Sequence, residues 1–273
     1  MEPFDVLVEE TADRPVVSLP PELERIHGGD LRFAEECVYA NFVSTLDGVV
    51  AIPSLPNSNA VVAGDNDADR FLMGLLRALA DVVLVGAGVL RASPSSTWRA
   101  EQIYPPAADA YAELRASLDL PPAPEIAVLC GWGHIEPDHP VLRGRALVLT
   151  SDRGAERLEN RLPDTTVVVS LGRRLRFTGD VIIDALRERG HRRILSEAGP
   201  HTFGALLDAS QVDELFLTTS PFLAGDAGPE SRLRLVEAAD LVPLVGGRLL
   251  ALRRHDDHLF SRYALAGRNG ARD

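Results

Sequence analysis

The stretch VVLVGAGVLR, residues 82–91, decides the fold. Four apolar residues lead into Gly86, Ala87 and Gly88, after which the chain returns to apolar residues. A buried strand that runs into a glycine turn is a common place for a nucleotide phosphate, because small residues let backbone N–H groups approach closely. The first question is whether this turn is the dinucleotide fingerprint of a Rossmann domain.

The Rossmann fingerprint does not continue past the second glycine. It needs a third glycine three residues later, and that position holds Arg91. The acidic residue expected about 20 positions on would be Glu101, which lies in TWRAEQIYPP rather than at the end of a strand. The turn also follows the second or third predicted strand instead of the first. The Rossmann interpretation therefore fails, while the argument for an anion at the turn still holds.

A second turn of the same kind follows later in the chain. Residues 192–208, RRILSEAGPHTFGALLD, read as a strand, then Ala198, Gly199 and Pro200, then a helix. Two glycine turns on one parallel sheet could straddle an extended, doubly phosphorylated cofactor. Two ordinary strand-to-helix turns are the alternative that spacing alone leaves open.

Short apolar runs alternate with helical patterns over most of the chain. The predicted strands are residues 37–43, 81–86, 125–130, 146–150, 165–170 and 192–196, each expected to be buried on both faces. The predicted helices are residues 66–81, 107–118 and 179–190. Three later runs, residues 213–222, 247–257 and 258–265, predict an antiparallel end to the sheet. The pattern predicts one α/β domain with a mostly parallel sheet.

The composition excludes several classes of function. The 273 residues carry a net charge of −12, which argues against a broad nucleic-acid surface. All 28 basic residues are arginine, so lysine Schiff-base chemistry and a Walker-type phosphate loop are excluded. Cys37 and Cys130 lack a CxxC partner, which predicts a cytoplasmic protein without disulfides. We also expect no signal peptide and no membrane span.

Several further motifs follow one another along the chain: NFVSTLDG at residues 41–48, Gly64-Asp65, Asp69-Arg70, Leu76-Arg77-Ala78, VGAG at residues 85–88, Glu197-Ala198-Gly199-Pro200, and DEL at residues 213–215. Taken in this order, they resemble the reductase domain of bacterial riboflavin biosynthesis, a member of the dihydrofolate reductase-like family. The resemblance covers roughly residues 37–265. No metal site is expected, because His134 and His139 lie in a Gly- and Pro-rich loop that favours a turn.

The resemblance implies an α/β, dihydrofolate reductase-like, three-layer fold whose mostly parallel central sheet ends in antiparallel C-terminal strands. The reductase domain would span residues 36–266, after an N-terminal arm or cap at residues 1–35 and before a disordered tail at residues 267–273. The implied activity is NADPH-dependent reduction of a phosphorylated aminopyrimidine, 5-amino-6-(5-phosphoribosylamino)uracil, from ribosyl to ribityl. A cytoplasmic homodimer paired through strands 247–265 is expected. The alternatives are a dihydrofolate, pterin or other small-molecule reductase, and a non-catalytic NADP-binding homologue.

The resemblance also carries a set of candidate site residues. The cofactor would be bound by Val85, Gly86, Ala87, Gly88, Val89, Thr150, Ser151, Ala198, Gly199, Pro200, His201 and Thr202. The substrate would be bound by Asn41, Ser44, Asp47 and Glu197. Asp47 and Glu197 are the candidate catalytic residues, since a buried acid with a raised pKa could move a proton. Arg91 and Arg153 are the candidates for binding the 2′-phosphate of NADPH.

Two residues depart from the family's pattern. Ala198 stands where the family has glycine, and Val89 stands where the family has threonine. Each change could remove about 1 kcal/mol of cofactor binding. The zinc deaminase signature, H-x-E with P-C-x-x-C, is absent from the sequence, so a role in flavin synthesis would be limited to the reduction.

Overall fold

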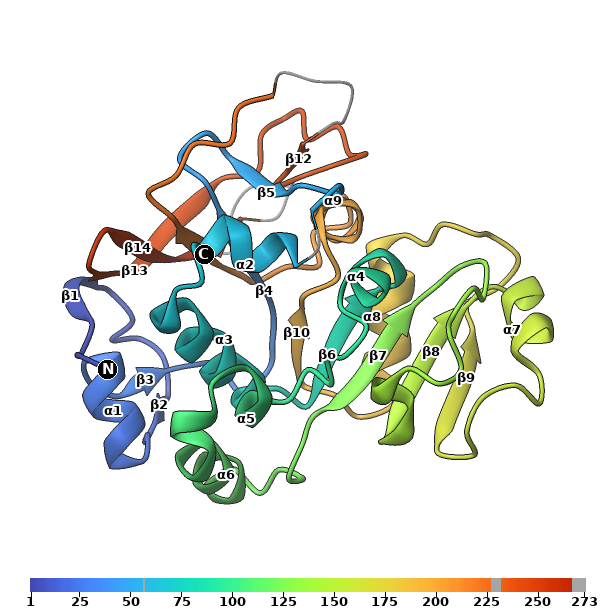
Figure 1. Cartoon of the computed structure of the whole chain (residues 1–273), viewed down its shortest axis with the longest axis horizontal. Coiled ribbons are helices and arrows are strands. Elements are labelled where there is room, and N and C mark those ends of the chain that lie inside the picture. The colour runs from blue at the N-terminus through green and yellow to red at the C-terminus, as the bar shows by residue number, and fades with distance from the viewer. Residues whose placement is uncertain (56, 227–231, 267–273) are drawn as a thin grey trace.

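The computed structural model describes residues 1–55, 57–226 and 232–266, so the predicted tail at residues 267–273 lies outside the described residues. Within the described ranges, ten strands form one large twisted sheet with helices on both faces (Figure 1). In spatial order the strands are β1 (Asp5–Glu9), β13 (Gly247–His255), β14 (His258–Leu265), β11 (Glu214–Thr219), β4 (Cys37–Ser44), β10 (Arg193–Ser196), β6 (Val82–Gly86), β7 (Glu125–Leu129), β8 (Ala146–Thr150) and β9 (Thr166–Ser170).

The sheet is parallel from β11 through to β9 and antiparallel at its other end. β11 pairs in parallel with β4. On its other side β14 runs antiparallel to β11, β13 antiparallel to β14, and β1 antiparallel to β13. The antiparallel end therefore begins one strand later than the sequence predicts, because residues 213–222 were expected to belong to it. The mostly parallel sheet with antiparallel C-terminal strands is confirmed.

Helices cover the two faces of the sheet in separate groups. One face carries α1 (Pro21–His27), α3 (Asp67–Leu79), α4 (Ala87–Ala92), α5 (Ala100–Ile103), α6 (Ala108–Ser117) and α7 (Asp152–Leu158). The other face carries α8 (Gly179–Arg187) and α9 (Pro200–Asp208). The alternation of side chains along β6 supplies both layers, since Val83 and Val85 pack with the first group and Val82 and Leu84 with the second. The predicted burial on both faces is thus confirmed for this strand.

The strand at the far edge departs from that expectation. β9 is half-buried, and the Val167 side chain is exposed. Only β8 pairs with it, so β9 lacks a second neighbour in the described sheet. An edge strand covered on one side leaves part of its apolar run in solvent.

The first 35 residues are integrated into the fold. β1 pairs with β13 and continues the main sheet. β2 (Val16–Val17) and β3 (Leu31–Arg32) form a small two-stranded sheet, and Leu23 and Phe33 are fully buried in the core. β1 covers the edge of β13 along residues 251–254, and the predicted pairing of two subunits through residues 247–265 stays a prediction.

A smaller structural unit lies beside the main sheet at its upper end in Figure 1. β5 (Val49–Ala51) pairs with β12 (Leu233–Arg234), and α2 (Ser58–Ala63) follows β5 in the chain.

Short 3₁₀ turns lie at Pro105–Ala107 and Pro140–Arg143 in the described residues. Across the described ranges, none of the helices is long and apolar enough to cross a bilayer.

Candidate active site

A cavity of about 880 Å³ opens at the carboxyl ends of β4, β6 and β10. These strands are neighbours in the sheet, so residues at their ends meet although they lie far apart in the sequence. In open parallel sheets this edge is where ligands bind. The cavity brings together most of the predicted site: Asn41, Gly86, Ala87, Gly88, Val89, Glu197, Ala198, Gly199, Pro200, His201 and Thr202 all line it.

The two glycine turns lie against each other because β6 and β10 are adjacent. A Cβ atom on Gly86 would collide with the backbone carbonyl oxygen of Ala198, so only glycine allows this approach. Gly199 caps the start of α9 with a φ of 84°, a backbone conformation that favours glycine. The pairing of the two turns is therefore built into the residues that form them.

The two departures from the family's pattern are part of the packing between these turns. Ala198 is buried in the core cluster beneath α9. A Cβ atom on Gly199 would come within 3.1 Å of the Val89 Cγ2 atom, so the Val89 side chain faces the second turn. The space that a threonine hydroxyl would occupy is thus apolar here.

A bidentate ion pair forms part of the cavity wall. Arg77 Nε lies 3.1 Å from Glu197 Oε1, and Arg77 Nη2 lies 2.7 Å from Glu197 Oε2. The two side chains are only 6% and 10% exposed. Arg77 comes from α3, and Glu197 follows β10 directly, so the pair joins helix and sheet. Sequence reasoning named Arg77 only as part of a motif.

A second acidic residue in the cavity was not among the candidates. Asp69 lies in the first turn of α3, is 5% exposed and lines the cavity. Burial raises the pKa of Asp69 to about 6. The sequence places Asp69 in an ordinary helix start, and nothing in it shows that β11 and β14 enclose the carboxyl group.

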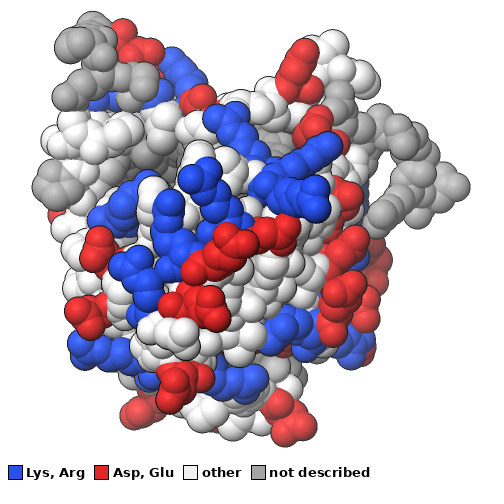
Figure 2. Space-filling view, turned by 90° about the vertical axis from the view of Figure 1, so that its right-hand side faces the viewer, with Lys and Arg blue, Asp and Glu red and all other residues white. Residues whose placement is uncertain are grey.

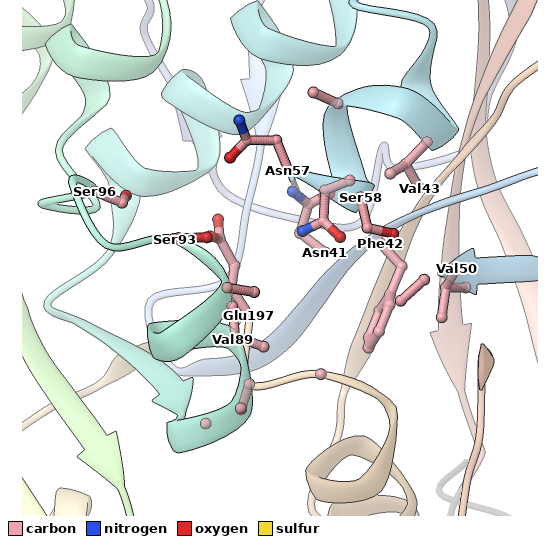
Figure 3. Close-up of a pocket in the computed structure, with 18 of the residues that line it drawn as sticks. Asn41, Phe42, Val43, Val50, Asn57, Ser58, Val89, Ser93, Ser96 and Glu197 are labelled. Atoms are coloured by element: carbon pink, nitrogen blue, oxygen red, sulfur yellow. The ribbon is translucent and has the colours of Figure 1, made fainter. Parts of the chain in front are cut away.

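Polar side chains approach the cavity from several elements. Figure 3 shows Asn41, Ser58 and Glu197 around one space, with Phe42 and Val50 forming an apolar wall beside it. Ser93, Ser95 and Ser96 line the side next to α4. Their hydroxyl-rich run, SPSST after Ala92, is the signal in the sequence that could have identified this wall.

The loop that carries these serines is held in an unusual conformation. Gln102 accepts hydrogen bonds from the Thr97 backbone N–H (2.6 Å) and hydroxyl (2.8 Å) and donates one to the Ser95 carbonyl oxygen at 3.0 Å. Trp98 is buried against the cavity with a φ of 51°, which is uncommon for a bulky residue. Such strained positions cluster at functional sites.

Asp47 and Ser44 are not among the residues that line this cavity. Hydrogen bonds from the Thr45 hydroxyl and from the backbone N–H groups of Ala224 and Gly225 lower the pKa of Asp47 to about 2. A proton relay needs a raised pKa, so the premise of that hypothesis is wrong for Asp47, whose carboxylate instead ties two loops together. The Ser44 carbonyl oxygen accepts a hydrogen bond from the Ser220 backbone at 2.8 Å.

Three predicted cofactor contacts also lie outside the cavity lining. Val85 is a fully buried strand residue beneath the first turn. Thr150 donates a hydrogen bond to the Cys130 carbonyl oxygen at 2.6 Å, and Ser151 donates one to the Gly131 carbonyl oxygen at 2.7 Å. Ser151 also caps α7. These hydroxyl groups hold the ends of β7 and β8 together.

A second cavity of about 400 Å³ adjoins the first, and Arg91 lines both. Arg157, Arg161 and His134 contribute further basic groups to its lining. Arg153 stacks over the half-exposed Trp132 ring, with its guanidinium carbon 5.7 Å from the ring centroid. Figure 2 shows basic side chains gathered on the side of the molecule where β9 and α7 lie. In a chain with a net charge of −12, this is a local concentration of positive charge.

The histidines of the 131–139 loop are engaged in other contacts. His139 Nε2 lies 3.2 Å from the Ser93 carbonyl oxygen, and His139 Nδ1 accepts a hydrogen bond from the Val141 backbone. His134 contacts Arg157. Within the described parts of the chain, no group of three or more His, Cys, Asp or Glu residues is arranged to bind a metal ion.

The fold is similar to that of several solved structures. A pyrimidine reductase-like protein from Corynebacterium diphtheriae has a TM-score of 0.66 and 20% identity, and the match covers 85% of this chain and 92% of that one. RibD from Acinetobacter baumannii has a TM-score of 0.61 and 17% identity over 85% of this chain and 58% of its own. The riboflavin biosynthesis reductase Rib7 from Saccharomyces cerevisiae has a TM-score of 0.56 and 13% identity over 88% and 94%. These similarities confirm the predicted dihydrofolate reductase-like fold.

The matches cover different shares of the three solved structures. This chain spans a little over half the length of the Acinetobacter protein but nearly all of the other two. No curated protein sequence matches the chain. The model of the RibD C-terminal domain matches residues 36–238, which is most of the sequence and includes both glycine turns and the Arg77–Glu197 pair. The chain therefore belongs to the RibD C-terminal domain family.

Proposed function

We propose that the protein is an NADPH-dependent reductase that converts the ribosyl group of 5-amino-6-(5-phosphoribosylamino)uracil to a ribityl chain. The observation that carries the proposal is the cavity in which two glycine turns face the buried Arg77–Glu197 pair. Family membership adds support, and a related structure from Thermotoga maritima is described as a deaminase and 5-amino-6-(5-phosphoribosylamino)uracil reductase.

The residues at the two turns fit a dinucleotide. The first N–H groups of α9, on His201 and Thr202, have no partner within the helix and lie at the cavity. Gly86 and Gly199 keep side chains out of the space between the turns. The residues Gly86–Val89 and Ala198–Thr202 would hold the diphosphate, and NADPH would supply a hydride. The apolar Val89 leaves backbone N–H groups as the main donors on the first turn.

The arginines beside the second cavity support NADPH over NADH. A 2′-phosphate carries negative charge that arginine binds well. Arg91 borders both cavities, and Arg153 lies over Trp132, so the two sequence candidates flank one basic region. Arg157 and Arg161 extend that region along α7 and beyond it.

The opposite part of the cavity would bind the substrate. Asn41 and Ser58 offer hydrogen-bonding groups, and Phe42 provides an apolar surface for a pyrimidine ring. We assign Glu197 an orienting role, because both of its carboxylate oxygens are bonded to Arg77 and the pair is rigid. Asn41 and Glu197 thus remain the proposed substrate contacts, whereas Ser44 and Asp47 support the surrounding loops.

Cofactor titration is the first test, with nicotinamide fluorescence as the signal. NADPH is expected to bind in the micromolar range and NADH at least tenfold more weakly, a difference of about 1.4 kcal/mol. Arg91→Ala and Arg153→Ala should weaken NADPH binding with little effect on NADH. Arg187→Ala, an exposed arginine on the opposite face, is the matched control. Equal affinity for both nucleotides would refute the assignment of NADPH.

Turnover then tests the substrate. NADPH oxidation should require the phosphoribosylaminopyrimidine and yield the ribityl product, identified by mass spectrometry. Turnover of dihydrofolate or a pterin in place of the phosphoribosylaminopyrimidine would support the alternative of a dihydrofolate or pterin reductase. If the protein binds NADPH but oxidises it only at the background rate with every substrate tried, it is a non-catalytic homologue. The two departures from the family's pattern, Val89 and Ala198, would then explain the loss of activity.

A homodimer and a cytoplasmic location complete the proposal. Both cysteines are buried and free, as expected in a reducing compartment. If subunits pair through a sheet edge, the open edges of the described sheet are β1 and β9. Light scattering on the purified protein gives the mass directly, and a monomer at micromolar concentration would refute the dimer.

A further inference from the structure

Asp69 is enclosed by three elements that lie far apart in the sequence. It sits on α3, and the Thr218 hydroxyl of β11 and the His258 ring of β14 face it. Asp69 nonetheless lines the same cavity as Glu197. A buried acid that borders a ligand cavity is a candidate for proton transfer.

The His258 ring beside Asp69 is held in place by hydrogen bonds. Asn66 Oδ1 accepts hydrogen bonds from the backbone N–H groups of Ala68 (2.9 Å) and Asp69 (3.0 Å), which orients the amide. Asn66 Nδ2 therefore donates to His258 Nδ1 at 3.1 Å, and His258 Nε2 donates to the Ala63 carbonyl oxygen at 3.0 Å. Both ring nitrogens of His258 are therefore held by groups other than the Asp69 carboxyl.

The cations closest in sequence to Asp69 are engaged elsewhere. Arg70 pairs with Asp65 at 2.7 Å and with Asp67 at 3.0 Å, towards solvent. Arg77, two turns further along α3, is bound to Glu197. The carboxylate of Glu197 faces Asp69 and disfavours a second negative charge. Burial is the main cause of the raised pKa of Asp69, and the Glu197 charge adds to it, whereas the Thr218 hydroxyl, His258 and Arg70 lower it.

We propose that Asp69 donates the proton taken up by the substrate nitrogen during reduction. This inference rests on the proposed function, in which the ribosylamine opens to a C1′=N imine. C1′ receives the hydride supplied by the reduced nicotinamide, and the π electron pair of the C=N bond moves to nitrogen. The O–H bond of Asp69 breaks as the new N–H bond forms, and the resulting carboxylate regains its proton from solvent.

The assignment predicts a particular dependence of turnover on pH. The protonated acid is the active form, and burial raises the pKa of Asp69 to about 6. Turnover should therefore be constant below about pH 6 and fall tenfold per pH unit above it, until another step limits the rate. A purely structural Asp69 would not produce this limb.

Asp69→Asn tests the role directly, because the amide has nearly the same shape but no acidic proton. Turnover should fall about 10²–10⁴-fold and lose the limb near pH 6, with NADPH affinity unchanged. Asp67→Asn is the matched control, because Asp67 is the first residue of the same helix and its side chain is exposed. This variant should keep wild-type turnover. Retention of turnover within threefold by Asp69→Asn would overturn the proposal.

Two measurements keep the test valid if Asp69→Asn folds poorly. Infrared titration of the wild-type protein without cofactor should show a carboxyl group that loses its proton near pH 6, and its absence would overturn the proposal. Thr218→Val removes a hydroxyl that lowers the pKa of Asp69, so the limb should move to higher pH. If the wild type fails to turn over the pyrimidine while binding NADPH, the proposed function fails and this role fails with it. An active wild type with an active Asp69→Asn overturns this role alone.

Discussion

Arg77 and Glu197 form a nearly buried ion pair in the wall of the cavity. Both side chains are nearly buried, and two hydrogen bonds join them. Arg77→Met would leave the Glu197 carboxylate buried without a cation, so the free energy of unfolding should fall by about 3 kcal/mol or more. Urea denaturation gives this value.

Arg70 provides the comparison on the same helix. Its ion pairs with Asp65 and Asp67 lie at the surface, so Arg70→Met should change the free energy of unfolding by less than about 1 kcal/mol. Similar small losses in both variants would mean that the Arg77–Glu197 pair contributes no more than a surface pair.

Asp69 should make the protein's stability depend on pH. Because burial raises the pKa of Asp69 to about 6 in the folded chain, the stability that it contributes is fully present below its unfolded value near pH 4 and is lost as the pH rises through 6. Asp69→Asn removes this ionisation. Its stability relative to wild type should therefore increase by about 2 kcal/mol from pH 4 to pH 8.

The measurement is thermal or urea unfolding of both proteins across that pH range. A constant difference between the two curves would show that Asp69 titrates alike in the folded and unfolded chains. A functional acid that costs stability at neutral pH is an expected compromise, since active sites and stability often compete.

At the scale of elements, the contact between the two glycine turns depends on Gly86. Gly86→Ala places a Cβ atom into the Ala198 carbonyl oxygen, which forces β6 and β10 apart at the cavity. We expect a loss of about 2 kcal/mol in the free energy of unfolding and at least tenfold weaker NADPH binding.

Gly88→Ala is the matched variant two residues further on. A Cβ atom there meets nothing within 4 Å, and the residue lies in α4. Alanine favours a helix, so stability should be unchanged or slightly higher. If both variants unfold at the same denaturant concentration, the close approach at Gly86 is not what holds the turns together.

The elements that the sequence predicts best are those buried on two faces. Runs such as residues 81–86 and 146–150 are apolar throughout, and the structure places strands at Val82–Gly86 and Ala146–Thr150. β1 was missed because DVLVE is short, largely exposed and flanked by acidic residues. Its strand conformation comes from β13, and a partner so distant in the chain leaves no local pattern.

The candidate site follows the same division. The glycine turns were predictable, since a strand followed by small residues is a local signal. Asp69 was not, because Thr218 and His258, which interact with its carboxyl group, come from strands that follow much later. Asp47 was assigned a proton-transfer role from its place after a strand, whereas hydrogen bonds from the Thr45 hydroxyl and from the backbone of Ala224 and Gly225 lower its pKa.

At the scale of the whole molecule, β1 protects the sheet edge and anchors the N-terminal segment. Phe4, just before it, is buried against Phe71 and Phe260. Deleting residues 1–10 should lower the melting temperature by roughly 5–10 °C and expose β13, so that the protein self-associates. Calorimetry and light scattering report the two effects separately.

Phe4→Ala separates loss of packing from exposure of the edge. It removes the aromatic contacts but keeps β1 in place, so the melting temperature should fall while the mass in solution stays that of the intact protein. Aggregation of Phe4→Ala to the same extent as the deletion would show that packing, and not the covered edge, prevents association.

The pairing of Val6 with Arg253 also sets an order of events during synthesis. β1 is synthesised well before β13, the strand that pairs with it, because almost all of the other elements lie between them in the chain. The hairpin of β13 and β14 must emerge before the sheet can receive β1 on its open side. Synthesis of β13 and β14 therefore determines when β1 can join the sheet.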